Sequence, residues 1–180
     1  MLSLVLQQVH NMSLYTQYKN LITDDLFLRP YSVHGITHSK RVLWLASQIV
    51  DIIQLNHREE IVLALACCYH DIGRINDCYN EEHGALSAKK VIKLGLLDGY
   101  GLNNEEIELI LGLITLHSMP DDIFVSRDKP LLLYQILKDA DALDRIRLGK
   151  GDLDPAYLRL EASKGLIKTA EDLFEGRIEI

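Results

Sequence analysis

The sequence has few cysteines and no long hydrophobic run, and both absences exclude classes of protein. The neighbours Cys67 and Cys68 lie in an apolar stretch and Cys78 lies in a polar one, which is unlike the disulfide framework of a small secreted protein. The longest strongly apolar run, Ile61 to Tyr69, is far shorter than the roughly 18 residues that a transmembrane helix needs. The first 12 residues contain no Lys or Arg, so we do not expect a signal peptide there. These features indicate a cytoplasmic protein that does not enter a membrane.

An excess of basic residues is also missing. The chain has 19 Lys and Arg against 26 Asp and Glu, which gives a formal net charge of -7. Binding to duplex nucleic acid depends on clustered Lys and Arg that neutralise phosphates, so we expect a small molecule as the partner instead. That molecule can still be an anion, because a bound divalent metal supplies local positive charge.

Linkers, repeats and low-complexity segments are absent, and 180 residues suit one compact domain over 1–180. The hydrophobic spacing is helical almost throughout, which predicts an all-α fold of about seven to eight helices. Gly73 is expected to end the third helix in a left-handed conformation, and Asn80 to cap the fourth. The expected helices are Leu2–Leu21, Ile36–Leu55, Arg58–Ile72, Asn80–Leu96, Asn103–His117, Pro130–Arg147 and Pro155–Ser163. A weakly amphipathic tail follows from Gly165, and it either packs on the body or joins a neighbouring subunit in a homo-oligomer.

Side chains that can bind metals fall on the apolar faces of the second and third expected helices. His38 has the helical spacing of its apolar neighbours Val42, Leu45, Ile49 and Ile52, so its imidazole is expected to point inward. His70 and Asp71 follow the almost wholly apolar run, with no basic residue expected to pair the carboxylate. An unpaired buried carboxylate is costly, so we expect a cation there. The competing interpretations are a hydrogen-bonded core histidine at His38 and a solvated helix end at His70 and Asp71.

The later helices add further candidates. Asp141 shares a helix face with Tyr134 and Leu137, whereas Asp139 is rotated by about 200°, so the register favours Asp141 as the inward acid. Asp144 lies one turn later and either orients a metal ligand or forms a surface ion pair. His117 ends the apolar face of its helix, and His83 lies on a less apolar row.

Two imidazoles and two carboxylates, from His38, His70, Asp71 and Asp141, form a nitrogen and oxygen ligand set. This set suits Mn, Fe, Co, Zn, Ni or Mg and leaves coordination positions open for water. If His83 and His117 join the set, Asp71 can bridge two ions about 4 Å apart. We therefore expect one or two divalent metal ions.

Three segments, in this order, resemble the motifs of the HD-domain superfamily. They are His34-Gly35-x-x-His38, His70-Asp71-Ile72-Gly73-Arg74 and Ala140-Asp141-Ala142-Leu143-Asp144. The resemblance covers 31–147 and implies a helical core there, on which an N-terminal helix (1–21) and a C-terminal helical tail (155–180) would pack. It also implies that His38, His70, Asp71 and Asp141 bind a divalent metal, and that the commonest activity is hydrolysis of phosphate esters.

The segments Glu82-His83-Gly84-Ala85 and Leu116-His117-Ser118 are similar to the extra histidines of members that hold a second metal or grip a phosphate. The chain lacks the GYP signature of cyclic-dinucleotide members and the Ala-Asp-Arg-Leu-His segment of alarmone hydrolases. The resemblance therefore favours neither of these two specialised activities.

These observations predict a phosphohydrolase that acts on a small phosphate ester, such as a nucleotide, through a metal-activated water. Asp71 would orient the water, and His117 or His83 would hold phosphoryl oxygens or protonate the leaving group. His34, Arg41 and Arg74 are candidates for substrate binding, with structural ion pairs as the alternative for the two arginines. Two other functions fit the same residues: a di-iron oxygenase of the HD type, and a non-catalytic sensor that binds a nucleotide.

Overall fold

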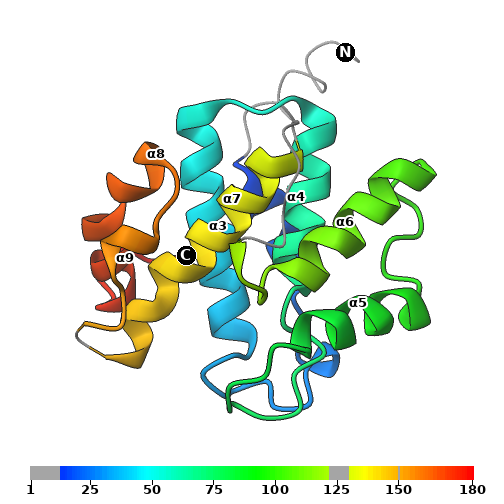
Figure 1. Cartoon of the computed structure of the whole chain (residues 1–180), viewed down its shortest axis with the longest axis horizontal. Coiled ribbons are helices and arrows are strands. Elements are labelled where there is room, and N and C mark those ends of the chain that lie inside the picture. Colours follow the sequence, from blue (N-terminus) through cyan, green and yellow to red (C-terminus); the bar gives the residue numbers. More distant parts are fainter. Residues whose placement is uncertain (1–12, 122–129, 150) are drawn as a thin grey trace.

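A computed structural model describes residues 13–121, 130–149 and 151–180. Over these residues the chain is all-helical and has no strand, which confirms the predicted fold class (Figure 1). No helix in the described ranges is both long enough and apolar enough to span a membrane. The α-helices are α2 (Leu14–Tyr18), α3 (Ile36–Ile53), α4 (His57–Tyr69), α5 (His83–Leu94), α6 (Asn104–Leu116), α7 (Pro130–Leu143), α8 (Glu161–Lys164) and α9 (Ile167–Phe174).

Helix α4 is the centre of the molecule. Every residue from Ile61 to Tyr69 is buried, as expected for a helix that is apolar on all sides. The helix starts at a capping box in which the Asn56 and Glu59 side chains each accept a backbone N–H of the other residue. It packs against α2, α3, α6 and α7, so its C-terminal end lies inside the molecule.

The remaining helices pack around this centre. Helices α5 and α6 pack against each other, and α7 packs along α3 and also contacts α4 (Figure 1). After α7 the chain continues as a 3-10 turn, η4 (Asp144–Leu148), against which α9 packs. Helix α8 contacts α3 and α7, so the C-terminal segment lies on the body of the same chain.

The expected helix Pro155–Ser163 is wrong. The structure has a short 3-10 turn, η5 (Pro155–Tyr157), and then α8 from Glu161. Between them the backbone is extended because the N–H groups of Arg159 and Leu160 bond to the buried Asp139 carboxylate on α7. These tertiary hydrogen bonds replace the ones that a continuous helix would make.

Several other boundaries differ from the expected ones. Residues 1–12 lie outside the described ranges, so only Leu14–Tyr18 of the expected first helix is seen as α-helix. Asn80 does not cap α5, which begins at His83; its side chain instead accepts the N–H of Glu82 at 2.8 Å. Ile52 is 58% exposed and does not belong to the buried face that it was expected to share with His38.

Gly73 does not adopt the left-handed conformation that was expected. A side chain at this position would place its Cβ atom 2.2 Å from the backbone nitrogen of Ser87. Gly73 is therefore needed for the close approach of α5 to the turn after α4.

Candidate metal centre

Six candidate side chains meet where five helices end or begin. His38 lies in the first turn of α3, His83 begins α5, and His70 and His117 are the C-caps of α4 and α6. Asp71 lies in the turn after α4, and Asp141 is near the end of α7. All except Asp141 are buried. Each helix thus contributes a residue from its terminal turn, where the chain can aim a side chain along the helix axis.

The Nδ1 atoms of the four histidines share one kind of partner, an oxygen that can only accept. An Nδ1 next to such an oxygen carries the proton and donates it, so in the neutral imidazole Nε2 keeps its lone pair. This arrangement is typical of histidines that bind metals through Nε2. The four bonds run from His38 to Asp144 Oδ2 (2.7 Å), from His70 to Cys67 O (2.8 Å), from His83 to Asn80 O and from His117 to Ile114 O (2.6 Å).

The Nε2 atoms face each other in two pairs. His38 Nε2 is 3.1 Å from His70 Nε2, and His83 Nε2 is 2.9 Å from His117 Nε2. Two lone pairs at this distance repel each other unless a proton or a metal ion lies between them. Two nitrogen ligands that bind one metal at about 2.1 Å and at right angles lie roughly 3.0 Å apart. The spacing within each pair therefore fits two nitrogen ligands that bind the same ion, one ion for each pair.

The Asp71 carboxylate lies between the two histidine pairs. Its Oδ2 is 3.5 Å from His38 Nε2, and its Oδ1 is 3.2 Å from His83 Nε2 and 3.5 Å from His117 Nε2. Within the described ranges Oδ1 is buried and accepts no hydrogen bond. Such an atom is costly in a protein interior unless a cation compensates it. Two compact groups that can hold metal ions thus share this residue: His38, His70 and Asp71, and Asp71, His83 and His117.

Asp141 approaches the first group from its open side. Its Oδ1 is 3.3 Å from His38 Nε2, and its side chain is 33% exposed. It does not belong to either compact group. Asp139 is buried but faces the other way and accepts hydrogen bonds from Arg159 and Leu160. The helical register thus places Asp141 beside the histidines, but the expectation that Asp141 and not Asp139 is the inward acid is wrong: Asp139 is fully buried on another face of α7, and Asp141 is the partly exposed one.

The charges in the centre are strongly coupled. Burial opposes ionisation of Asp71, but the neighbouring histidines outweigh it and hold the pKa of this carboxyl well below its usual range. Burial also opposes protonation of His38, yet hydrogen bonds with Asp141, Asp144 and Asp71 raise its pKa to about 10. Burial lowers the pKa of His70 to about 3. The carboxylates therefore favour a cation beside His38, and in the metal-free protein a proton takes that place.

Asp144 holds His38 in position and is itself held by arginines. It is buried, and it accepts hydrogen bonds from Arg41 Nε and from Arg41 Nη2 (3.2 Å), while Arg147 Nη1 lies 3.4 Å away. Asp144 thus orients a candidate ligand, and the surface ion-pair alternative is wrong. Arg41 makes the ion pair that was expected as the alternative to phosphate binding.

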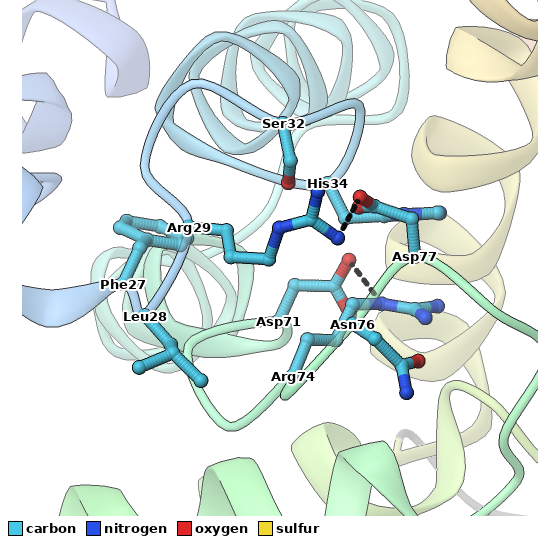
Figure 2. A pocket seen from close by; sticks show the side chains of 9 residues that line it. All are labelled: Phe27, Leu28, Arg29, Ser32, His34, Asp71, Arg74, Asn76 and Asp77. Atoms are coloured by element: carbon cyan, nitrogen blue, oxygen red, sulfur yellow. Dashed lines mark hydrogen bonds and ion pairs between the residues drawn. The ribbon is translucent and has the colours of Figure 1, made fainter.

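A second ion pair corrects the expectation that no basic residue pairs Asp71. Arg74 Nε lies 3.0 Å from Asp71 Oδ2, because the turn after α4 brings the chain back beside the carboxylate. Figure 2 shows this pair below a second one, in which Arg29 Nη1 lies 2.7 Å from Asp77 Oδ2. His34 is close by: its Nδ1 is 3.3 Å from Asp77 Oδ1, and burial lowers its pKa to about 4.

A pocket of about 260 Å³, called the outer pocket below, opens over the other side of the centre. Its lining includes Arg74, His83, His117, Lys138 and Asp141. Lys138 was missed at the sequence level although it lies one turn before Asp141 on the same helix, and this spacing is a signal that could have found it. His34 does not line this pocket but a smaller cavity next to Asp71.

A comparison of the sequence with models of known protein families identifies the family of this chain. A family model of the HD domain matches residues 35–146, a range that contains all six candidate side chains. The chain belongs to the HD-domain family. Members of this family are mostly metal-dependent hydrolases, so the HD match and the two histidine–aspartate groups agree in the chemistry that they indicate. No curated protein and no solved structure matches the chain.

Proposed function

We propose that this HD-domain protein is a metal-dependent phosphohydrolase that acts on a small phosphate ester. The observation that carries the proposal is the position of Asp71 between two pairs of imidazole nitrogens. Its carboxylate is buried, and in the described residues its Oδ1 atom accepts no hydrogen bond. Hard oxygen and imidazole nitrogen donors without a thiolate are typical of catalytic sites that keep coordination positions open.

His38, His70 and Asp71 would hold the first ion, and Asp141 would complete this set from the open side. His83 and His117, with the second oxygen of Asp71, would hold a second ion or grip the phosphate. A bound divalent metal lowers the pKa of a water molecule and draws negative charge from a phosphoryl oxygen. Asp71 would orient the attacking water, because its carboxylate lies between both groups.

The outer pocket supplies the remaining functions. Arg74 and Lys138 line its wall, where each is paired with an aspartate, Asp71 and Asp121, and each would also donate a charge-assisted hydrogen bond to a phosphate. His117 also lines this pocket and would hold a phosphoryl oxygen or, when protonated, donate the proton to the leaving oxygen. The substrate would enter from this side, since Asp141 is the exposed member of the set.

The test combines metal analysis with a substrate screen. The purified protein is analysed for metal content, then assayed on nucleotides and sugar phosphates with Mn, Co, Mg or Zn added. Asp71→Asn keeps the shape of the side chain but removes its charge, so we expect loss of bound metal and at least a hundredfold loss of turnover. Asp51→Asn, at an exposed position of α3, is the matched control and should leave both unchanged. Normal turnover in Asp71→Asn would refute the proposal.

The same experiment separates the two competing functions. A di-iron oxygenase would be purified with two irons and an oxo-bridge absorption band, and its product would depend on oxygen. A sensor would bind nucleotides with no turnover under any metal. Hydrolysis of phosphate esters under anaerobic conditions is the result that we expect, and it excludes both.

A further inference from the structure

The outer pocket has a second end that the metal centre does not use. Beyond Asp141 its wall is formed by Ala142, Arg145 and Tyr157. The same three residues also line a neighbouring hollow of about 350 Å³. Arg145 and Tyr157 therefore stand at the junction of the two hollows, where the part of a substrate that points away from the metals would lie.

Most of the positive charge in the outer pocket is already neutralised by ion pairs. Arg74 pairs with Asp71, and Lys138 and Arg159 both pair with Asp121. Arg145 is also paired, with Asp152, but less tightly. Its Nε donates to the backbone oxygen of Asp152 at 3.0 Å, but its Nη2 is 3.7 Å from the Asp152 carboxylate, beyond hydrogen-bond distance, and half of the side chain is exposed. The outer edge of this guanidinium is thus available for a ligand.

Tyr157 is exposed, and hydrogen bonds hold the backbone on both sides of it. Its residue is 70% exposed, and it ends the 3-10 turn η5, which Asp154 caps by accepting the N–H of Ala156 at 2.9 Å. Two residues later, the backbone and guanidinium of Arg159 bond to the buried Asp139 carboxylate. This anchoring fixes the backbone that carries an accessible aromatic ring at the rim of the pocket, where the face of the ring is available for a ligand.

We propose that Tyr157 and Arg145 bind the planar ring of a nucleoside monophosphate, whose phosphate lies at the metal centre. This inference rests on the proposed phosphohydrolase function and names its substrate class. An aromatic face stacks on any nucleobase, and a guanidinium edge donates to the ring's oxygen and nitrogen acceptors. The outer pocket of about 260 Å³ and the adjoining hollow of about 350 Å³ are together large enough for a small-molecule ligand.

The first test compares substrates that differ only in the base. Adenosine 5′-monophosphate and uridine 5′-monophosphate carry a ring, and ribose 5-phosphate does not. Tyr157→Ala should raise KM for both nucleotides about tenfold, the effect of one lost stacking contact, with unchanged KM for ribose 5-phosphate and unchanged kcat for all three. Arg145→Gln should raise KM for the same two nucleotides. Tyr31→Ala removes an 85% exposed tyrosine that does not line the outer pocket and should have no effect.

A second measurement does not depend on turnover. Adenosine has no phosphate, so its binding to the full chain, followed by saturation-transfer NMR, reports the ring site alone. We expect binding to the natural chain and to Tyr31→Ala, and its loss in Tyr157→Ala. Equal adenosine signals in all three, or an equal loss of activity on ribose 5-phosphate in Tyr157→Ala, would overturn the inference. Adenosine binding without hydrolysis of any ester would refute only the proposed function.

Discussion

Each histidine in the centre owes its orientation to one hydrogen bond. His70, His83 and His117 donate Nδ1–H to the backbone oxygen three residues earlier, and His38 donates to the Asp144 carboxylate. Cys67 and Ile114 lie in the last turns of α4 and α6, where carbonyl oxygens lack intrahelical partners and can accept the bonds from His70 and His117. The two pairs of Nε2 atoms are thus held in place on either side of Asp71 before any metal binds, which reduces the entropy cost of coordination.

The bond between Asp144 and His38 gives the first prediction. Asp144→Asn weakens the acceptor that holds the ring, and loss of such a partner typically costs 10- to 100-fold in metal affinity. We expect at least a tenfold rise in the Kd for Mn²⁺ or Co²⁺, measured by calorimetric titration. Asp77→Asn is the matched control, because Asp77 contacts His34, which belongs to neither metal group. The Kd of this control variant for the metal should be the same as that of the natural chain. Unchanged affinity in Asp144→Asn would show that Asp144 does not position His38.

Two close contacts of glycine backbones bring α5 to its place in the centre. A Cβ atom at Gly73 would lie 2.2 Å from Ser87 N, and one at Gly84 would lie 2.5 Å from Ile114 O. Gly73 N–H also donates to Ser87 Oγ at 2.9 Å. The first contact joins α5 to the turn that carries Asp71, and the second joins it to α6 near His117. These contacts explain how His83 reaches both residues.

The second prediction concerns these contacts. Gly73→Ala forces α5 away from the turn, because the atom in the way belongs to the backbone and cannot rotate aside. We expect a loss of about 1–3 kcal/mol in the free energy of unfolding, measured by urea denaturation. Gly112→Ala is the control: it lies inside α6 with nothing within 4 Å of an added Cβ, so it should be neutral or stabilise by up to about 1 kcal/mol. Equal stability of Gly73→Ala and the natural chain would contradict the close-packing argument.

The centre also links elements of the whole molecule that are far apart in sequence. Its six side chains come from α3, the end of α4, α5, α6 and α7, so an ion bound there connects most of the helices that surround α4. Ligands that bind only the native state raise its stability by mass action, and coordination by buried residues belongs to this class. The metal is thus expected to stabilise the fold as well as to support chemistry.

Removal of the metal gives the third prediction. At a free metal concentration of about 100 times Kd, the gain is about 2.7 kcal/mol, and this corresponds to a Tm rise of roughly 5–10 °C for a chain of this length. Excess EDTA should remove that rise in a thermal scan. Asp141→Asn should show a smaller shift, because the exposed fourth ligand is lost while the buried residues stay in place. A Tm that does not respond to metal or chelator would argue against a metal site in the interior.

Much of the candidate site could be predicted from the sequence. The apolar spacing placed His38 on the inner face of its helix, and the helical register placed Asp141, not Asp139, beside it, as the structure shows. The predicted helix Asn103–His117 agrees with α6, which Asn103 caps. Local signals suffice for such features because they depend on residues within one or two turns.

Other features required the fold. The pairing of Arg74 with Asp71, the close packing at Gly73 and the break before α8 all depend on segments that meet only in three dimensions. The same holds for Tyr157, which lines the outer pocket although it lies outside the HD match over 35–146.

The sequence by itself determined the helical class, the apolar central helix and the types of ligand atom available, because composition and periodicity are local properties. The tertiary structure decided which imidazole nitrogens carry protons, how Asp71 is shared and which side of the centre is open. These depend on distances between side chains from different helices, and helix packing alone sets such distances.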